Sequence, residues 1–348
     1  MFAGNRNETL NLMHSMPAGK LGLALTAREL TALVADDLKQ VESVFRLESI
    51  GSVDAVSAIA RYLQGNGGKR LRPILLLVSC RLFREPSPEA IQLAAVVELI
   101  HTATLVHDDV IDDAKTRRGK SSANVVWGNQ ISVLAGDWLY MQAFQIALRL
   151  RRFEILDLLI TLTQRMVDGE LLQLERLGRI DISEADALEL IDHKTASLFA
   201  ACTRLGGIAG GASEHEQAVL SEFGWNLGMA FQIVDDILDF TARESVLGKP
   251  TGNDLREGKV TLPLCYALET ASAEERALVE TVLADRAYTR ASFEQIRALL
   301  LRHGGIERAR ARAFEFTSRA RSLLEQFPDT PARSALAAAT DLVADRDR

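Results

Sequence analysis

The sequence is poor in proline and cysteine and has no long uninterrupted apolar run. Only 8 of its 348 residues are proline and 3 are cysteine. Cys80, Cys202 and Cys265 are widely spaced in apolar surroundings, so they predict buried thiols and exclude a disulfide framework or a zinc site. No apolar run approaches the roughly 20 residues that a membrane span needs, and the N-terminus lacks a signal-peptide core. We therefore expect a cytoplasmic protein without a membrane span.

Acidic residues outnumber basic ones, 47 to 40. The formal net charge is −7, which argues against a nucleic-acid partner because phosphate-backbone affinity needs a basic surface. The composition, 47% hydrophobic and 25% charged, is that of a globular protein with a large core. Helix-forming residues dominate and no convincing alternating strand occurs, so we expect an all-α chain.

Helix-start signals recur along the chain and give its expected organisation. Residues 1–25 lack periodicity and predict a loose N-terminal tail, and residues 26–348 predict a single all-α domain. Ser87-Pro88 predicts an N-cap with proline at the first helical position. Capping boxes are predicted at Thr26–Glu29, Ser213–Glu216, Ser272–Glu275 and Ser292–Gln295.

Two acidic motifs of the same form, Asp108-Asp109-Val-Ile-Asp112 and Asp235-Asp236-Ile-Leu-Asp239, are the most informative stretches. Residues four apart on a helix are neighbours, so each motif presents a pair of carboxylates on one face. Such pairs repel unless a cation arrives. Mg²⁺ takes one or two carboxylates and completes its coordination with water and phosphate oxygens. The candidate metal ligands are Asp108, Asp109, Asp112, Asp235, Asp236 and Asp239.

An acidic pair can also be a solvated surface feature, and the chain contains an example for comparison. Asp36-Asp37 is followed by Lys39 and has no third aspartate, so we interpret it as surface. The two longer motifs differ because apolar helical sequence flanks each and basic residues follow each. They therefore favour a metal–diphosphate site.

Basic residues near these motifs are the candidate phosphate ligands. A glycine-rich turn carries Lys69 and Arg72 just before Pro73, where a helix N-terminus would attract an anion. Such a turn is by itself more often surface. Arg117 and Arg118 follow the first motif. Further candidates are Lys194, Lys249 and Lys259, the last two in a glycine-bearing segment that we expect to close as a lid.

The spacing of five residues predicts that they share one face of a helix. They are His101, Thr104, Leu105, Asp108 and Asp112. A lone helical histidine is usually a satisfied core residue. His101 lies about two turns before a predicted metal clamp, which makes a substrate contact an equal alternative.

Taken in order, these motifs resemble the trans-type isoprenyl diphosphate synthases, the polyprenyl synthetase family, over roughly residues 30–348. The resemblance implies an all-α bundle of about ten or more helices around a deep central cavity, in a homodimer. It implies Mg²⁺-dependent prenyl transfer that condenses isopentenyl diphosphate with an allylic diphosphate, farnesyl or geranylgeranyl. The motifs that carry it are Gly68-Lys69-Arg70-x-Arg72-Pro73, Glu98-x-x-His101, the first acidic motif with Arg117-Arg118-Gly119, Gly169-Glu170-x-x-Gln173, Lys194-Thr195, Phe231-Gln232 with the second acidic motif, and Lys249 through Gly258-Lys259.

The resemblance also implies residue roles. Asp108, Asp112 and Asp235 would hold three Mg²⁺, with Asp109, Asp236 and Asp239 nearby. Thr195 and Gln232 would face the developing carbocation with oxygen dipoles. The allylic diphosphate would be bound by Lys194, Lys249, Lys259 and Arg117, and isopentenyl diphosphate by Lys69, Arg72, His101 and Arg118.

Product length is expected to follow from the depth of the apolar cavity below Asp108. Family members with short products usually place an aromatic plug at the fourth and fifth positions before it, where this chain has Thr104 and Ala103. The chain most resembles long-chain synthases, with octaprenyl as the first expectation. On a helical wheel Thr104 lies near the face of Asp108 and Ala103 points away. Phe144 and Met141 are candidate floor residues, although core packing is the more ordinary role for either one.

Alternatives stay open at this point. They are a shorter-chain (geranylgeranyl or farnesyl) synthase, a terpene cyclase, a non-catalytic subunit of a heteromeric synthase and a purely structural bundle. The repeated motif counts against a cyclase, and the retained acidic residues count against a subunit that does not catalyse.

Overall fold

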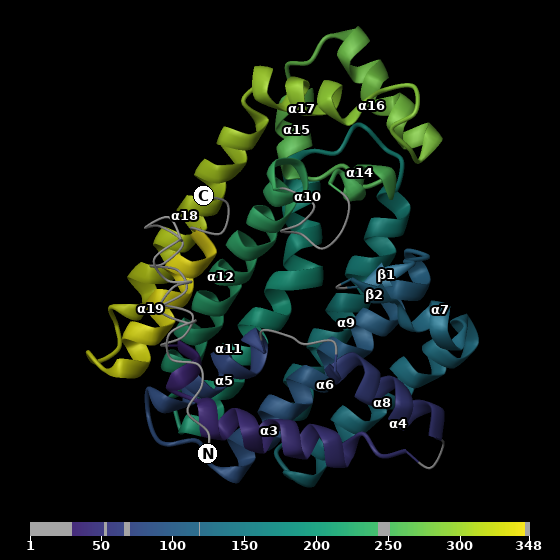
Figure 1. The fold of residues 1–348 in the computed structure, drawn as a ribbon. Helices are drawn as coiled ribbons and strands as arrows, with labels where there is room; N and C mark the ends of the chain where they lie inside the picture. The colour runs from purple at the N-terminus through teal and green to yellow at the C-terminus, as the bar shows by residue number, and fades with distance from the viewer. Residues whose placement is uncertain (1–29, 52–53, 66–69, 118, 243–250, 345–348) are drawn as a thin grey trace, which may run out of the picture.

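The computed structural model describes residues 30–51, 54–65, 70–117, 119–242 and 251–344. These ranges are almost entirely helical, which confirms the all-α expectation (Figure 1). Their only strands are the two-residue pair β1 (Thr116–Arg117) and β2 (Lys120–Ser121). The α-helices are α3 (Ala35–Glu48), α4 (Asp54–Gly65), α5 (Leu71–Arg81), α6 (Pro88–Ile111), α7 (Ala123–Trp127), α8 (Asn129–Arg149), α9 (Phe153–Arg176), α10 (Glu184–Ile191), α11 (Ser197–Gly210), α12 (Glu214–Thr241), α14 (Asn253–Arg256), α15 (Leu262–Leu268), α16 (Ala273–Asp285), α17 (Phe293–Arg302), α18 (Gly305–Leu324) and α19 (Pro331–Ala344).

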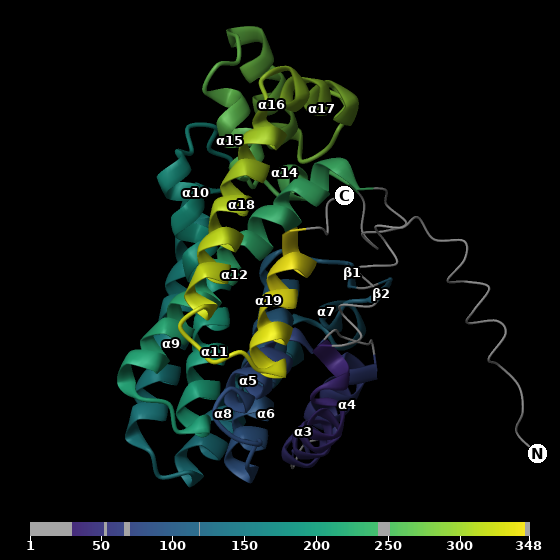
Figure 2. The ribbon, with the colours of Figure 1, turned by 90° about the vertical axis from the view of Figure 1, so that its left-hand side faces the viewer.

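The long helices α6, α11 and α12 form the centre of the bundle. Helix α6 packs against α5 and α8, and α12 packs against α11 on one side and α18 on the other (Figure 2). Within the described ranges α6 is also the one helix long and apolar enough to cross a membrane, with a mean hydropathy of 1.4. Because 72% of that stretch is buried inside the protein, its apolar character is explained by its central position.

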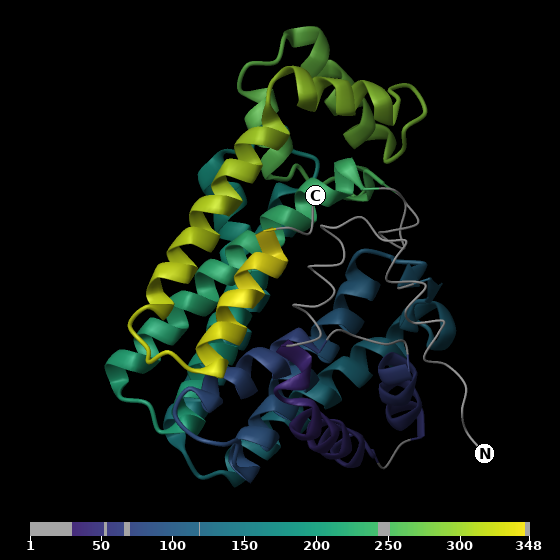
Figure 3. The same ribbon diagram turned by 60° about the vertical axis from the view of Figure 1, so that its left-hand side comes forward.

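Shorter helices close the two ends of the bundle. Helices α15, α16 and α17 gather at one end beside the start of α18, and α3 and α4 lie at the opposite end (Figure 3). Helices α10 and α11 are joined without a break by one turn of π-helix, η1 (Asp192–Ala196). This turn is defined by the bond that the Ser197 backbone N–H donates to the Asp192 carbonyl oxygen five residues earlier.

Most local signals in the sequence are confirmed. Capping boxes begin α12, α16 and α17 as predicted, and Ser87 caps α6 with proline in its first turn. A further box at Ser183 and Asp186 begins α10 and was not predicted. The predicted box at Thr26–Glu29 and the predicted tail lie outside the described residues. All three cysteines are buried and free.

The interpretation of Asp36-Asp37 as surface is wrong for its second residue. Asp37 is only 8% exposed, and its Oδ2 accepts a hydrogen bond of 2.8 Å from Arg81 on α5. Asp36 is exposed and pairs with Lys39 as expected. The sequence offered no sign of the Arg81 contact, because the two partners lie on different helices 44 residues apart.

Candidate active site

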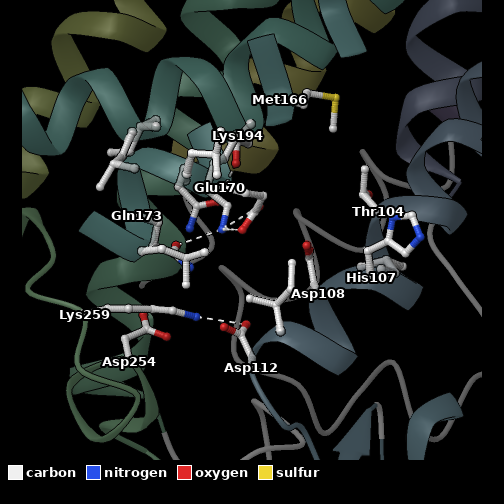
Figure 4. A pocket seen from close by; sticks show the side chains of 18 of the residues that line it. Thr104, His107, Asp108, Asp112, Met166, Glu170, Gln173, Lys194, Asp254 and Lys259 are labelled. Atoms are coloured by element: carbon white, nitrogen blue, oxygen red, sulfur yellow. Dashed lines mark hydrogen bonds and ion pairs between the residues drawn. The ribbon is translucent and has the colours of Figure 1, made fainter. Parts of the chain in front are cut away.

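The two acidic motifs lie at the C-terminal ends of α6 and α12 and meet at one cavity of about 830 Å³. Its wall includes Asp108 and Asp112 from the first motif (Figure 4), and Asp235 and Asp236 from the second. Asp109, the second aspartate of the first motif, and Asp239, the last of the second motif, are fully buried and are not among the residues that line the cavity. Four of the six aspartates therefore line the cavity, and the other two hold neighbouring segments of the chain in place.

Asp109 and Asp239 each anchor a segment that brings other groups to the cavity. Asp109 Oδ1 accepts a hydrogen bond of 2.6 Å from Arg117 Nε on β1, so it fixes the small hairpin that follows α6. The two carboxylate oxygens of Asp239 accept the backbone N–H groups of Asn253 and Asp254, each at 3.2 Å. In this way α14 is held against the second motif, and Asp254 enters the cavity wall.

The cavity concentrates negative charge away from water. Burial raises the pKa of Asp108 from 3.8 to about 7, and the nearby carboxylate of Glu170 adds to the effect. Burial likewise raises the pKa of Asp236 well above its usual value, and the negative charge of Asp254 raises it further. A bound cation would stabilise carboxylates that are held together in this way, so the set of ligand groups suits a divalent metal.

The described acids do not form a preassembled cage. Within the described ranges, no three carboxylate, imidazole or thiol groups already converge closely enough to hold a metal ion. This arrangement suits Mg²⁺, which uses one or two carboxylates and takes its other ligands from water and substrate phosphates. The acids on either side of the cavity would then be joined by a ligand that carries phosphate oxygens.

Two lysines that line the same cavity, Lys194 and Lys259, are each paired with an acid. Lys194 Nζ donates to Glu170 at 2.9 Å and to the Gln173 amide oxygen at 2.8 Å, and Lys259 Nζ donates to Asp112 at 3.0 Å (Figure 4). Burial would lower the pKa of Lys259, but Asp112 and Glu257 raise it more, so this ammonium stays charged at any ordinary pH. These ion pairs hold the two ammonium groups in place at the wall of the cavity.

The π-turn η1 presents Lys194 and Thr195 to the cavity. Thr195 Oγ1 donates to the Gln232 amide oxygen at 2.9 Å, and Gln232 Nε2 donates to Asp236 at 2.9 Å, so the amide is oriented by a hydrogen-bonded chain. An added Cβ at Gly169 would lie 2.8 Å from the His193 Cβ, and one at Gly228 would lie 2.6 Å from the Ala196 Cα. Glycine at both positions lets α9 and α12 approach the π-turn closely.

A second cluster of predicted residues lies on α5 and α6. Arg72 Nη1 donates a 3.0 Å hydrogen bond to His101 Nε2, and the guanidinium also lies over the Phe199 ring, 5.4 Å from its centroid. Both Arg72 and His101 line the cavity, so the structure brings them to the same chamber as the acidic motifs. Lys69, Arg118 and Lys249 lie outside the described residues.

The candidate chain-length residues do not all reach the cavity. Thr104 lines it, whereas Ala103 is fully buried outside the lining set. Phe144 is partly buried against the core and also lies outside the lining set. Met141 is 62% exposed and does not line the cavity, so the structure does not place it at the cavity floor. The wall below Asp108 instead includes Tyr140 and His107, whose rings stack with centroids 5.9 Å apart, and Met166.

Tyr140, His107 and Asp254 have no role in the sequence prediction, and Glu170 and Gln173 enter it only as parts of a motif. A signal was present for Glu170 and Gln173, because they lie three residues apart on one face of a helix. None existed for Tyr140, since its proximity to Asp108 depends on how α8 packs against α6.

Comparisons with known proteins agree with this geometry. The family model described as polyprenyl synthetase matches residues 53–300. The chain is 35% identical to octaprenyl diphosphate synthase from Escherichia coli (strain K12) over 324 residues, which cover 93% of this chain and 100% of that protein. It is 38% identical to geranylgeranyl diphosphate synthase from Sulfolobus acidocaldarius over 259 residues, 72% of this chain and 78% of that protein.

A solved structure with the same architecture holds a metal and a ligand. It is the polyprenyl synthase from Caulobacter crescentus CB15 complexed with calcium and isoprenyl diphosphate. The TM-score is 0.88 and the identity 36%, and the match covers 92% of this chain and 98% of that chain.

Proposed function

Because the chain belongs to the polyprenyl synthetase family and is a prenyltransferase, we propose that it condenses isopentenyl diphosphate head to tail with an allylic diphosphate to give a long all-trans polyprenyl diphosphate. The observation that carries this proposal is the meeting of both acidic motifs, with Lys194 and Lys259, at one cavity. Farnesyl or geranylgeranyl diphosphate is the proposed primer.

The metal requirement follows from the charges in the cavity. Asp108, Asp112 and Asp235 would hold Mg²⁺, with three ions per site as the family resemblance implies. When bound, the ions supply positive charge that stabilises the departing diphosphate. The same acids could not approach a diphosphate without such ions, because like charges would repel across a poorly solvated cavity.

The side chains of this enzyme then divide the work. Lys194, Lys259 and Arg117 exchange their acid partners for the oxygens of the allylic diphosphate and stabilise it as the C–O bond breaks. The carbocation that remains faces the oxygen atoms of Thr195 and Gln232. Arg72 and His101, with Lys69 and Arg118, hold isopentenyl diphosphate so that its double bond attacks the cationic carbon. The proton lost from the resulting cation goes to the departing diphosphate.

Exclusion of water is necessary for this chemistry, because water would capture the cation. The segment that carries Lys259 is held to both motifs, by Asp239 through the backbone of α14 and by Asp112 through the lysine itself. With substrate bound, the proposed lid formed by this segment and Lys249 would close over the diphosphate and add positive charge to it.

A long product, octaprenyl in the first instance, is supported by the cavity wall below Asp108. Thr104 occupies the position where short-chain members have an aromatic plug, and the apolar lining continues through Met166, Val167 and Leu171 on α9. The likeness to a geranylgeranyl diphosphate synthase makes a shorter product the alternative.

A homodimer is proposed from an unpartnered apolar face on α8 and α9. Exposed apolar side chains recur every seven residues on both helices, which is the spacing of a helix–helix seam. They are Leu134, Met141 and Leu148 on α8 and Phe153 and Ile160 on α9. Phe153 is 80% exposed. Exposure of a large aromatic side chain to water is unfavourable, and a second copy of the chain would cover it. Sedimentation of the Ile160→Glu variant as a monomer would support this face, and an unchanged dimer would exclude it.

The direct test of function is turnover by the purified chain. Labelled isopentenyl diphosphate and farnesyl diphosphate with Mg²⁺ should give a polyprenyl diphosphate of about eight isoprene units, and removal of the metal by a chelator should abolish it. Products that stop at geranylgeranyl diphosphate would overturn the length assignment alone. Absence of any elongation would overturn the proposed function.

A further inference from the structure

Asp192 lies on the outer side of the π-turn that carries Lys194 and Thr195. It does not line the active-site cavity but faces a second, more open hollow between α9, α11 and α12. Its Oδ1 accepts a hydrogen bond of 2.7 Å from Trp225 Nε1 on α12, and its Oδ2 accepts one from Arg165 on α9. One carboxylate therefore ties the π-turn to both neighbouring helices.

The inner side of the same turn makes a matching pair of contacts. Lys194 binds Glu170 and Gln173 on α9, and Thr195 binds Gln232 on α12. Each inner contact lies further along the same helix than the corresponding outer contact, since Arg165 precedes Glu170 and Trp225 precedes Gln232. The π-turn is thus fastened to α9 and to α12 on two faces, once by Asp192 and once by the active-site residues.

A π-turn needs such support because its geometry is less favourable than that of an α-helix. Tight approach alone does not fix the rotation of the turn, since Gly169 and Gly228 remove side chains from the two helix crossings without adding a directional bond. Charge-assisted hydrogen bonds are directional and stronger than neutral ones. Asp192 supplies them from a position that no substrate atom needs to reach.

Resting on the proposed function, we propose that Asp192 is a positioning residue, which acts with Trp225 and Arg165 to hold the π-turn so that Lys194 and Thr195 meet the allylic diphosphate and the carbocation. Its effect on catalysis passes through these two residues. Removing it frees this face of the turn from α9 and α12, so that Lys194 and Thr195 are held less firmly toward the cavity.

The test compares Asp192→Ala, Asp192→Asn and Trp225→Phe with a matched control. Trp225→Phe keeps an aromatic ring next to Phe316 and removes only the donor. Asp192→Asn keeps an oxygen that can accept from Trp225 but loses the charge that binds Arg165. The control is Glu189→Gln, which weakens the pairing of α10 with Arg176 of α9 close to the π-turn.

We expect Asp192→Ala to lower kcat about tenfold or more and Trp225→Phe about threefold or more, from the loss of hydrogen bonds to a charged group. Asp192→Asn should keep more activity than Asp192→Ala, and Glu189→Gln should match the parent chain. In a Lys194→Ala background the loss caused by Asp192→Ala should shrink to about twofold, because the group that it positions is already absent. If Asp192→Ala lowered kcat equally in the parent chain and in Lys194→Ala, Asp192 would only support the fold in general, and the proposal would be overturned.

A binding measurement separates this inference from the proposed function. Calorimetric titration of inorganic diphosphate in the presence of Mg²⁺ should show about tenfold weaker binding to Asp192→Ala and unchanged binding to Glu189→Gln. If the parent chain binds diphosphate but elongates no prenyl chain, the proposed function fails while positioning of Lys194 is still tested by this titration. Parent-like binding and kcat in both Asp192→Asn and Trp225→Phe would overturn the positioning role, whether or not Asp192→Ala folds.

Discussion

The ammonium nitrogen of Lys259 lies 3.0 Å from Asp112 Oδ2, although the two residues are 147 positions apart in the chain. Lys259 follows the second acidic motif and Asp112 ends the first, so this ion pair spans the two halves of the site. Both side chains are mostly buried, 18% and 24% exposed. A diphosphate with its metal ions would bind between them and replace the single bridge with several.

The Lys259→Ala variant should bind the allylic diphosphate more weakly. Loss of a charge-assisted hydrogen bond is expected to raise the KM for farnesyl diphosphate about 10- to 100-fold with a smaller effect on isopentenyl diphosphate. Lys39→Ala is the matched control, because Lys39 pairs with Asp36 on the exposed face of α3. Steady-state kinetics with each substrate varied in turn would check this, and equal effects on both substrates would contradict the assignment.

The raised pKa of Asp108 predicts a stability that falls with pH when no metal is present. The folded state holds the proton more tightly than the unfolded state, whose pKa is near 3.8. The stabilisation is therefore fully present below about pH 4 and is lost as the pH rises through about 7. Asp108→Asn should raise the free energy of unfolding by about 1–3 kcal/mol above pH 7 and flatten this dependence.

Denaturant unfolding of the two proteins across this pH range, without metal, would measure the effect. The ionised carboxylate is also the form that a metal needs, so Mg²⁺-dependent diphosphate binding to the parent chain should tighten as the pH rises through about 7. A parallel pH dependence in Asp108→Asn would show that another group is responsible.

Gly228→Ala tests the close approach of α12 to the π-turn. The added Cβ would lie 2.6 Å from the Ala196 Cα, a backbone atom that cannot move aside alone. We expect a loss of about 1–3 kcal/mol in stability and at least a tenfold fall in kcat, since the Thr195–Gln232 bond would be displaced. Gly207→Ala on α11 is the control, because there the one contact of the new Cβ below 3.0 Å is with a terminal methyl group of Leu220, which can rotate, and not with backbone. Comparable losses in both variants would contradict the argument.

Product length should respond to Thr104 more than to Phe144. Thr104→Tyr would place a ring in the cavity and is expected to shorten the product. Phe144→Leu should leave the length unchanged, because Phe144 is not among the residues that line the cavity. Ala103→Tyr is also expected to shorten the product. Because Ala103 is fully buried, we expect this substitution to lower the stability of the protein as well. Chromatography of dephosphorylated products would decide, and unaltered length in Thr104→Tyr would remove this residue from the mechanism.

Local spacing in the sequence was enough to predict the helices and the cavity face of the first motif. Periodicity of 3.6 residues correctly placed His101, Thr104, Leu105, Asp108 and Asp112 on one lining face. The same reasoning grouped all six aspartates as metal ligands, and the structure separates Asp109 and Asp239 from the cavity. Their partners, Arg117 and the backbone of α14, are set by how loops return to the helices, which periodicity does not describe.

Side-chain contacts between helices that are distant in the chain could not be predicted from the sequence. Arg81 binds Asp37, Trp225 binds Asp192 and Lys259 binds Asp112 across separations of 44, 33 and 147 residues. The π-turn was equally hidden, because residues 192–196 continue an ordinary helical pattern and the additional residue appears only when α9 and α12 are packed against it.

The two acidic motifs are proposed to gather divalent metal together around a substrate diphosphate. The decisive measurement is a crystal structure of the chain with Mg²⁺ and an unreactive allylic diphosphate analogue. We expect metal ions between the diphosphate and both Asp108–Asp112 and Asp235, with Lys194 and Lys259 turned onto diphosphate oxygens. An analogue bound elsewhere, with both acidic pairs free of metal and Lys259 still paired with Asp112, would contradict it.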